Sequence, residues 1–223
     1  NMVLKPSALV GDADEIAVDH GPRFVSRGGE KLLAALEAFG LTDLNGWICA
    51  DAGSSTGGFT DCLLQHGAEK VYAMDVGYGL LHWKLRNDPR VVVMEKTNVR
   101  DVKALPEGIN LVVVDASFIS LKLLLPVFRG WFADGAGTLV ALIKPQFEAG
   151  REEAAKGAGV IRDPAVHRKV LTEVLSSAEQ EAFEVRGLIR SPLLGPKGNT
   201  EFLARLVTPG GQSDIARQIR ELF

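Results

Sequence analysis

Four ionisable residues, two lysines and two carboxylates, could together move a proton if the fold brings them to one place. They are Lys31, Asp115, Lys144 and Glu201. A lysine takes a proton from a weakly acidic alcohol only when burial or a neighbouring cation favours its neutral form. Lys31 beside Lys144 would supply that cation, and the two carboxylates would orient the lysines. The alternative is that each residue only forms a surface salt bridge.

Residues 51–59 have the composition of a turn that brings the backbone close to a ligand. Their sequence is Asp-Ala-Gly-Ser-Ser-Thr-Gly-Gly-Phe, and glycine is needed where no side chain fits. The spacing GxxxGG differs from the GxGxxG of dinucleotide sites. Asp51, before the turn, would disfavour a pyrophosphate but suits the cationic methionine end of S-adenosylmethionine. The segment therefore predicts this cofactor, unless it is only a tight turn. The predicted contacts are Asp51, Gly53, Ser54, Ser55, Thr56, Gly57, Gly58 and Phe59.

Further cofactor contacts are expected after the next predicted strands. An acidic residue at the end of the second strand can accept hydrogen bonds from ribose hydroxyls, and Asp75 stands there unless it only caps a helix. After the third strand, Asn98 could bind the adenine edge, with Asp101 as the alternative and Val99 as a neighbouring contact. Asp115, at the end of the fourth strand, is counted with the cofactor residues as well.

A lysine base and an S-adenosylmethionine turn together suit methyl transfer to a ribose 2′-hydroxyl. The remaining rate would come from placing the methyl group and the oxygen in line. Methylation of a base amine is an alternative. Enzymes of that kind usually place Asn-Pro-Pro-aromatic after the fourth strand, and here the segment is Asp115-Ala-Ser-Phe. The ribose is therefore the favoured acceptor.

From Trp47 onward, short apolar strands alternate with helices, which indicates an α/β fold with an open, doubly wound, mostly parallel sheet and helices on both faces. The last two strands are joined by a loop too short for a parallel crossover, so the last strand should run antiparallel. This seven-stranded arrangement is typical of class I (Rossmann-like) methyltransferases. The predicted strands are 48–52, 70–75, 91–94, 110–115, 137–144, 183–189 and 201–207. The predicted helices are 30–39, 57–66, 79–87, 120–133, 163–180 and a short C-terminal one.

This topology would gather the ionisable residues at one edge of the sheet. Ligands of such sheets lie outside the carboxyl ends of the parallel strands. Asp115 and Lys144 end two of those strands, and Glu201 begins the reversed one, so all three should meet there. Lys31 would join them from the first helix, after a loop at 27–29.

Two segments are assigned to neither strand nor helix. Residues 146–162 are rich in charge and glycine and are predicted to be a mobile loop, a candidate lid over the acceptor. Residues 1–24 are too short and β-like to form a core of their own. They are expected to be the end of an upstream module plus a linker, followed by the catalytic domain at 25–223.

The composition is that of an ordinary globular protein, with 46% hydrophobic and 24% charged residues. The net charge of −3 argues weakly against a free-standing nucleic-acid-binding domain. No apolar run is long enough for a membrane span, and no secretory signal opens the chain. Cys49 and Cys62 lack CxxC spacing, and the four histidines are scattered, so we expect a cytoplasmic protein without a metal site.

The chain resembles the TlyA family, often labelled hemolysin A, within the FtsJ-like ribose 2′-O-methyltransferases. The resemblance covers roughly residues 25–207 and is carried by the motifs at 25–31, 51–61, 75–79, 115–120, 144–148 and 195–201. It implies that a Lys-Asp-Lys-Glu tetrad falls on Lys31, Asp115, Lys144 and Glu201. It also implies S-adenosylmethionine as cofactor, cytidine 2′-hydroxyls of ribosomal RNA as acceptor, and an N-terminal RNA-binding module of the ribosomal S-four type, whose last strands residues 3–18 resemble.

Two other classes of function stay open at this stage. A membrane-active hemolysin would need a long apolar or strongly amphipathic segment with a basic face, and the sequence has none. A non-catalytic RNA- or cofactor-binding module would not need the four ionisable residues. The target nucleotide, the ribosomal subunit and the oligomeric state are left open. Plausible contacts to RNA phosphates are Arg27, Lys122, Arg151 and Lys197.

Overall fold

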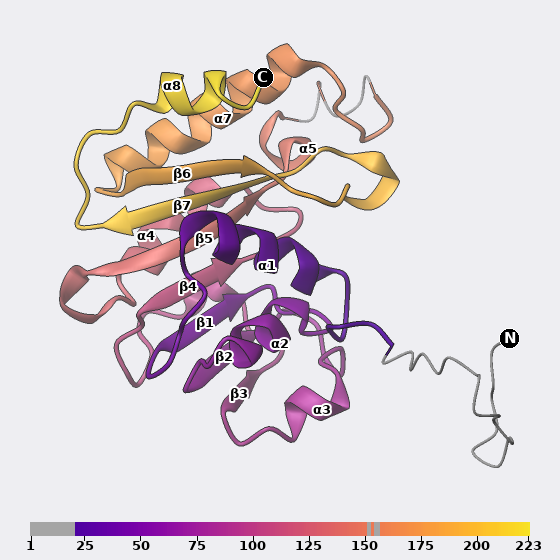
Figure 1. Cartoon of the computed structure of the whole chain (residues 1–223), viewed down its shortest axis with the longest axis vertical. Coiled ribbons are helices and arrows are strands. Elements are labelled where there is room, and N and C mark those ends of the chain that lie inside the picture. Colours follow the sequence, from indigo (N-terminus) through magenta and orange to yellow (C-terminus); the bar gives the residue numbers. More distant parts are fainter. Residues whose placement is uncertain (1–20, 151–152, 154–156) are drawn as a thin grey trace, which may run out of the picture.

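A seven-stranded sheet with helices on both faces forms the centre of the computed structural model, which describes residues 21–150, 153 and 157–223 (Figure 1). The strands are β1 (Ile48–Ala52), β2 (Lys70–Met74), β3 (Val91–Met94), β4 (Leu111–Val114), β5 (Gly137–Ile143), β6 (Glu184–Arg190) and β7 (Phe202–Thr208). The helices are α1 (Gly28–Phe39), α2 (Gly58–Gln65), α3 (Trp83–Arg86), α4 (Leu125–Arg129), α5 (Pro145–Glu148), α7 (Pro164–Gln180) and α8 (Ile215–Arg220). Short 3-10 helices lie at η1 (Val99–Asp101), η2 (Leu121–Leu123), η3 (Ala133–Gly135) and η4 (Pro196–Gly198).

The order of the strands confirms the predicted topology. It is β3-β2-β1-β4-β5-β7-β6, and among the described strands β7 alone runs opposite to the direction of the others. In the β5–β7 register, Ile143 at the end of β5 lies opposite Phe202 at the start of β7. The next residue outward on each strand is Lys144 or Glu201, so both stand at the same edge of the sheet.

Two apolar clusters hold the helices on the sheet. The first includes Leu32 and Leu36 of α1 and Leu63 of α2, all fully buried, and packs against one face. The second includes Phe128 of α4 and Leu171 of α7 and packs against the other. The strand β4 is buried along its whole length, as a strand covered on both faces should be.

Two predicted helices are wrong in extent. The helix predicted at 79–87 is only Trp83–Arg86, because Gly79 has a left-handed φ of 71° and cannot belong to a helix. The helix predicted at 120–133 is split into η2 and α4. Pro126 lies at the second position of α4, and proline lacks the N–H that a continuous helix would use there.

The loop predicted at 27–29 is also wrong, because Gly28 and Gly29 open α1 and Arg27 precedes it as its cap. A side chain on Gly29 would lie 2.2 Å from the Phe24 ring. These glycines therefore permit close packing inside a helix, where sequence reasoning took them for a loop.

Several predictions fall on residues that the structure does not describe. Residues 1–20, where the end of an RNA-binding module is expected, lie outside the described ranges, as do 151–152 and 154–156 in the predicted mobile loop. The start of that loop is not irregular, because α5 covers 145–148. Across the described ranges, no helix combines the length and the apolar character needed to cross a bilayer.

Leu36→Ala should lower the free energy of unfolding by about 2–5 kcal/mol, because it opens a cavity between α1 and the sheet. Urea denaturation would measure this loss. The control is Glu37→Ala, the exposed neighbour on the same helix, which should stay within about 0.5 kcal/mol of the parent. Equal effects of the two substitutions would show that this cluster does not hold α1.

Candidate active site

Two ion pairs meet at the edge of the sheet where the parallel strands end. Lys31 Nζ lies 2.6 Å from Glu201 Oε2, and Lys144 Nζ pairs with Asp115. Lys31, Lys144 and Glu201 are buried, and Glu201 is wholly inaccessible. All four residues line one cavity of about 240 Å³. The structure therefore brings together the four ionisable residues that the sequence singled out.

Lys31 reaches this cavity because α1 and α2 touch at their first turns. A side chain on Gly58 would lie 2.8 Å from the backbone nitrogen of Gly29 and 2.4 Å from the hydroxyl of Ser26. The absence of a side chain at Gly58 lets the two helix starts approach. The first turn of α1 then points Lys31 toward the reversed strand, where Glu201 accepts its hydrogen bond.

The segment before β7 closes around Glu201. A side chain on Gly195 would lie 2.0 Å from Glu201 Oε1, so only glycine fits there. Glu201 Oε1 is buried and has no hydrogen-bond partner among the described residues. The carboxylate thus holds Lys31 through Oε2, while Oε1 lies against Gly195.

Lys144 directly follows β5 and precedes α5, and its amine has a second partner. It donates a hydrogen bond to Ser117 Oγ at 3.0 Å, in addition to its ion pair with Asp115. Both partners follow β4. The neighbouring strands β4 and β5 therefore deliver the amine and its two acceptors to one place.

The glycine turn at 53–58 lies between the two ion pairs and the second strand. The backbone N–H groups of Gly53 and Ser54 both donate to the carbonyl of Met74, at 2.9 Å each. Gly53 has φ 88°, and a side chain there would lie 2.7 Å from the carbonyl oxygen of Asp115. The sequence pattern predicts that glycine is needed here because a ligand approaches the backbone. In the structure, glycine is needed because the end of the neighbouring strand β4 approaches it.

A second cavity, of about 460 Å³, adjoins the first and shares Gly53, Ser55 and Asp115 with it. Its wall is largely apolar, and its polar lining residues include groups that follow β2 and β3. Asp75 is one of them: its carboxylate accepts the N–H groups of Ser55 at 2.8 Å and Gly77 at 2.7 Å. The other lining residues are Val76, Leu80, Thr97, Asn98, Val99, Arg100, Ala116, Ser117, Phe118, Ile119 and Leu124.

The second cavity separates the two candidates for the adenine contact. Asn98 lines it, and its side-chain oxygen accepts the N–H of Arg100. Asp101 lies in η1 and does not line either cavity. The geometry therefore favours Asn98, with Val99 beside it.

Two residues of the predicted turn do not line either cavity. Ser54, Thr56, Gly58 and Phe59 line the first cavity, but Asp51 and Gly57 line neither. A side chain on Gly57 would meet Leu85 at 2.2 Å. Asp51 is fully buried behind the turn, where its carboxylate accepts a hydrogen bond from Thr60 at 2.6 Å. Burial raises the pKa of Asp51 to about 7, although the Thr60 hydrogen bond opposes this rise.

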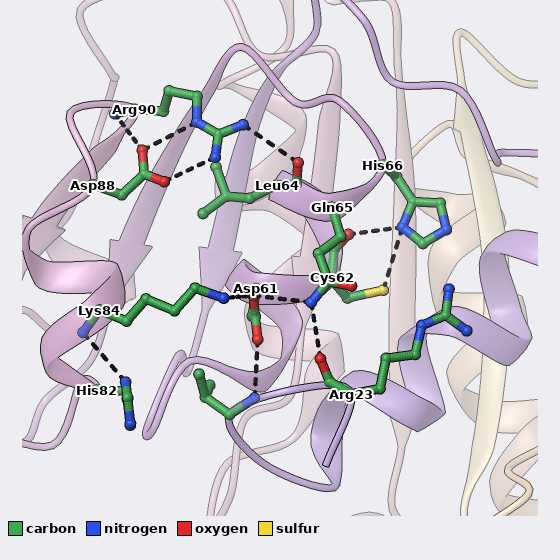
Figure 2. A network of polar contacts seen from close by, with 11 residues as sticks. Arg23, Asp61, Cys62, Leu64, Gln65, His66, His82, Lys84, Asp88 and Arg90 are labelled. Atoms are coloured by element: carbon green, nitrogen blue, oxygen red, sulfur yellow. Dashed lines mark hydrogen bonds and ion pairs between the residues drawn. The ribbon is translucent and has the colours of Figure 1, made fainter. Parts of the chain in front are cut away.

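The buried carboxylate of Asp61 fixes α2 from behind the turn (Figure 2). It accepts the N–H of Val25 at 2.9 Å and the side-chain amide of Gln65 at 3.2 Å, and Lys84 of α3 lies 3.4 Å away. These contacts attach the segment before α1 and the helix α3 to α2. The cavity wall is thereby tied to three elements at once.

The four predicted phosphate contacts do not form one group. Arg27 lines the first cavity. Lys122 lies 3.7 Å from Glu173 of α7 and lines neither cavity, and Lys197 is an exposed residue of η4 that also lines neither. Arg151 lies outside the described residues. Of the three described residues, only Arg27 is placed to meet an acceptor in the cavity.

Sequence reasoning missed several lining residues. Ser26, Leu193 and Leu194 complete the first cavity, and Ser117 and Phe118 reach the second. Ser117 belongs to the motif at 115–120, but the sequence pattern predicts no function for it. Leu194 and Phe118 are 57% and 90% exposed, but exposure of a large apolar side chain cannot be read from the sequence.

Within the described ranges, no group of His, Cys, Asp or Glu could hold a metal ion.

The chain is similar to known proteins over most of its length. The profile of the FtsJ-like methyltransferase family matches residues 24–207. The 16S/23S rRNA (cytidine-2′-O)-methyltransferase TlyA of Mycobacterium tuberculosis is 45% identical over 98% of this chain and 81% of its own length. Hemolysin A of Brachyspira hyodysenteriae is 44% identical over 89% of this chain and 82% of its own length.

Solved structures support the same relationship. A structure from Streptococcus thermophilus, which has hemolysin in its name, is 46% identical and superposes with a TM-score of 0.84 over 90% of this chain and 74% of its own. The N-methyltransferase NodS from Bradyrhizobium japonicum superposes with a TM-score of 0.56 over 82% of this chain and 98% of its own, at 16% identity. The second likeness concerns the fold alone.

Gly53→Ala should weaken S-adenosylmethionine binding by about tenfold or more, because the new side chain would push away the carbonyl of Asp115 at the junction of the two cavities. Calorimetry would measure this. Gly40→Ala is the matched control: Gly40 also has a left-handed φ, 67°, but a side chain there meets nothing within 4 Å. The placement of the turn is wrong if both variants bind the cofactor like the parent.

Asp51 should make the folded state less stable as the pH rises from about 4 to about 7. In that window the folded chain keeps a proton that the unfolded chain has lost, because the pKa is raised from 3.8 to about 7. Asp51→Asn should therefore gain stability relative to the parent, by at most about 1.4 kcal/mol per pH unit, with no further gain above pH 7. Urea denaturation across this range would test it.

Proposed function

Because the chain belongs to the FtsJ-like methyltransferase family, we propose that it transfers a methyl group from S-adenosylmethionine to ribose 2′-hydroxyls of ribosomal RNA, with cytidine as the target nucleoside. One observation carries this proposal. The four charged residues line one cavity, and two residues of its wall, Asp115 and Gly53, also line a second, largely apolar cavity. An acceptor in the first cavity would thus lie next to a cofactor in the second.

The second cavity suits S-adenosylmethionine, which would supply the methyl group. Val99, Ile119 and Leu124 offer apolar contact for a purine ring, and Asn98 offers an amide for its edge. The Asp75 carboxylate is available to ribose hydroxyls. Asp115 stands where the cavities join, so its negative charge would face the cationic part of the cofactor. Asp51, behind the turn, would act through Thr60 and the backbone only.

The first cavity suits a ribose hydroxyl. Lys144 is the proposed base, since its amine is buried, lines the cavity and is oriented by Asp115. Lys31 is held by Glu201 on the opposite pair and would bind and orient the ribose. Arg27 at the same cavity would contact a phosphate of the RNA backbone. Burial of Lys31, Lys144 and Glu201 excludes water, which strengthens the electrostatic interactions between their charges.

Lys144→Ala should reduce methyl transfer to ribosomal RNA by about 100-fold or more, while cofactor affinity stays unchanged. Transfer of labelled methyl groups to ribosomal RNA and calorimetry with S-adenosylmethionine would measure the two effects. Lys122→Ala is the matched control, because that lysine pairs with Glu173 and lines neither cavity. Full activity of Lys144→Ala would remove its role as base.

Analysis of the methylated nucleosides identifies the acceptor in the same experiment. We expect 2′-O-methylcytidine, and a methylated base in its place would contradict the ribose assignment. Leakage of liposomes by both the parent and Lys144→Ala would instead support a membrane activity independent of methyl transfer.

A further inference from the structure

The side chain of Ser117 contacts the proposed base directly. Ser117 is not one of the four charged residues, and the motif at 115–120 does not by itself predict a function for it. Its hydroxyl accepts a hydrogen bond from Lys144 Nζ at 3.0 Å. We propose that Ser117 is a positioning residue which, together with Asp115, aims the amine of Lys144 at the acceptor hydroxyl. This inference rests on the proposed function of the site.

The geometry of an amine nitrogen explains why two acceptors matter. The nitrogen of Lys144 has four tetrahedral directions, and one of them is taken by its own side chain. A hydrogen donated to Ser117 takes a second, and the ion pair with Asp115 draws another hydrogen toward that carboxylate. The fourth direction is left for the cavity that Lys144 lines. In the neutral amine it holds the lone pair, and after transfer it holds the proton that leaves the hydroxyl oxygen, whose bonding pair stays on the oxygen.

The backbone that presents Ser117 is held in an unfavourable conformation. The next residue, Phe118, has a left-handed φ of 64°, which is costly for a bulky side chain. Phe118 is 90% exposed, so burial of its ring does not explain this conformation. Strained residues persist where surrounding contacts hold them, and they are frequent at active sites. The conformation of Phe118 therefore indicates that the backbone beside Ser117 is held in one particular arrangement, which fixes the direction of the Ser117 side chain.

A second contact joins the same two segments. The ring of Phe118 packs on that of Phe147, with centroids 4.9 Å apart, and the N–H of Phe147 donates to the carbonyl of Lys144 at 2.9 Å. The contacts of hydroxyl with amine and of ring with ring thus both attach the segment after β4 to the segment after β5. Both contacts limit the movement of the Lys144 amine relative to Ser117.

Apart from Asp115, the carboxylates near Lys144 are paired with other groups, so the second partner of the Lys144 amine is the uncharged hydroxyl of Ser117. Glu201 is occupied by Lys31, and Glu148 accepts from the hydroxyl of Ser120 at 2.6 Å and from the N–H of Leu121 at 2.7 Å. Asp115 neutralises the amine. Ser117 adds a direction without adding charge, so it can orient the amine in either protonation state.

Kinetics with purified protein and ribosomal RNA test the proposal. Ser117→Ala should lower kcat about tenfold, with cofactor affinity and the KM for RNA within about twofold of the parent. Ser117→Thr, which keeps the hydroxyl, should restore most of the rate. The inflection of the pH–rate profile should move to lower pH in Ser117→Ala only, because the hydroxyl accepts from the charged amine and its loss disfavours that form. Ser176→Ala, on α7, is the matched control, since no α7 residue lines either cavity.

A readout that needs no turnover separates this inference from the proposed function. In protein labelled with ¹³C-lysine, the Lys144 signal, assigned with Lys144→Arg, should titrate at lower pH in Ser117→Ala and as in the parent in Ser117→Thr. Parental kcat and parental titration in Ser117→Ala would overturn the inference, as would equal defects in both variants or a loss confined to cofactor binding. If the parent transfers no methyl group to RNA, the proposed function fails, and the titration alone decides the role of Ser117.

Discussion

The buried ion pair between Lys31 and Glu201 is the constraint on which the site depends. A charged group taken out of water costs several kcal/mol unless an opposite charge meets it, so neither residue can occupy its position alone. The two are separated by most of the chain and come from α1 and from the segment before β7. Their contact therefore requires that the first helix and the reversed strand be placed correctly at the same time.

The reversed strand makes that placement possible. Had β7 run parallel to β5, its first residue would lie at the opposite edge of the sheet, far from Lys144. Its antiparallel course puts Phe202 opposite Ile143 and thus Glu201 near Lys144. Glycines at 53, 58 and 195 then allow strand ends and helix starts to approach, because a side chain at each would meet protein atoms within 3 Å. Contacts within the chain thus shape the cavity.

Much of the fold could be predicted from the sequence, because it depends on local apolar patterns and on loop lengths. The apolar strand β4 and the short connection before β7 are examples, and they placed Asp115, Lys144 and Glu201 at one edge. The extents of α3 and α4 could not be predicted, because the left-handed Gly79 and the position of Pro126 decided them. The partners of individual side chains could not be predicted from the apolar pattern either. Lys122 pairs with Glu173 through the packing of η2 on α7, and the burial of Asp51 depends on α2.

The two lysines are made different by their partners. Lys31 faces a carboxylate that is wholly inaccessible, so giving up its proton would leave Glu201 buried without a counter-charge. Lys144 faces Asp115, whose side chain is 25% exposed, and Ser117, which is exposed to solvent. A proton on Lys144 thus has a route to water, and the charge left on Asp115 is partly solvated. The asymmetry supports the proposed division, binding and orientation by Lys31 and proton transfer by Lys144, and it follows from burial and not from the residue type.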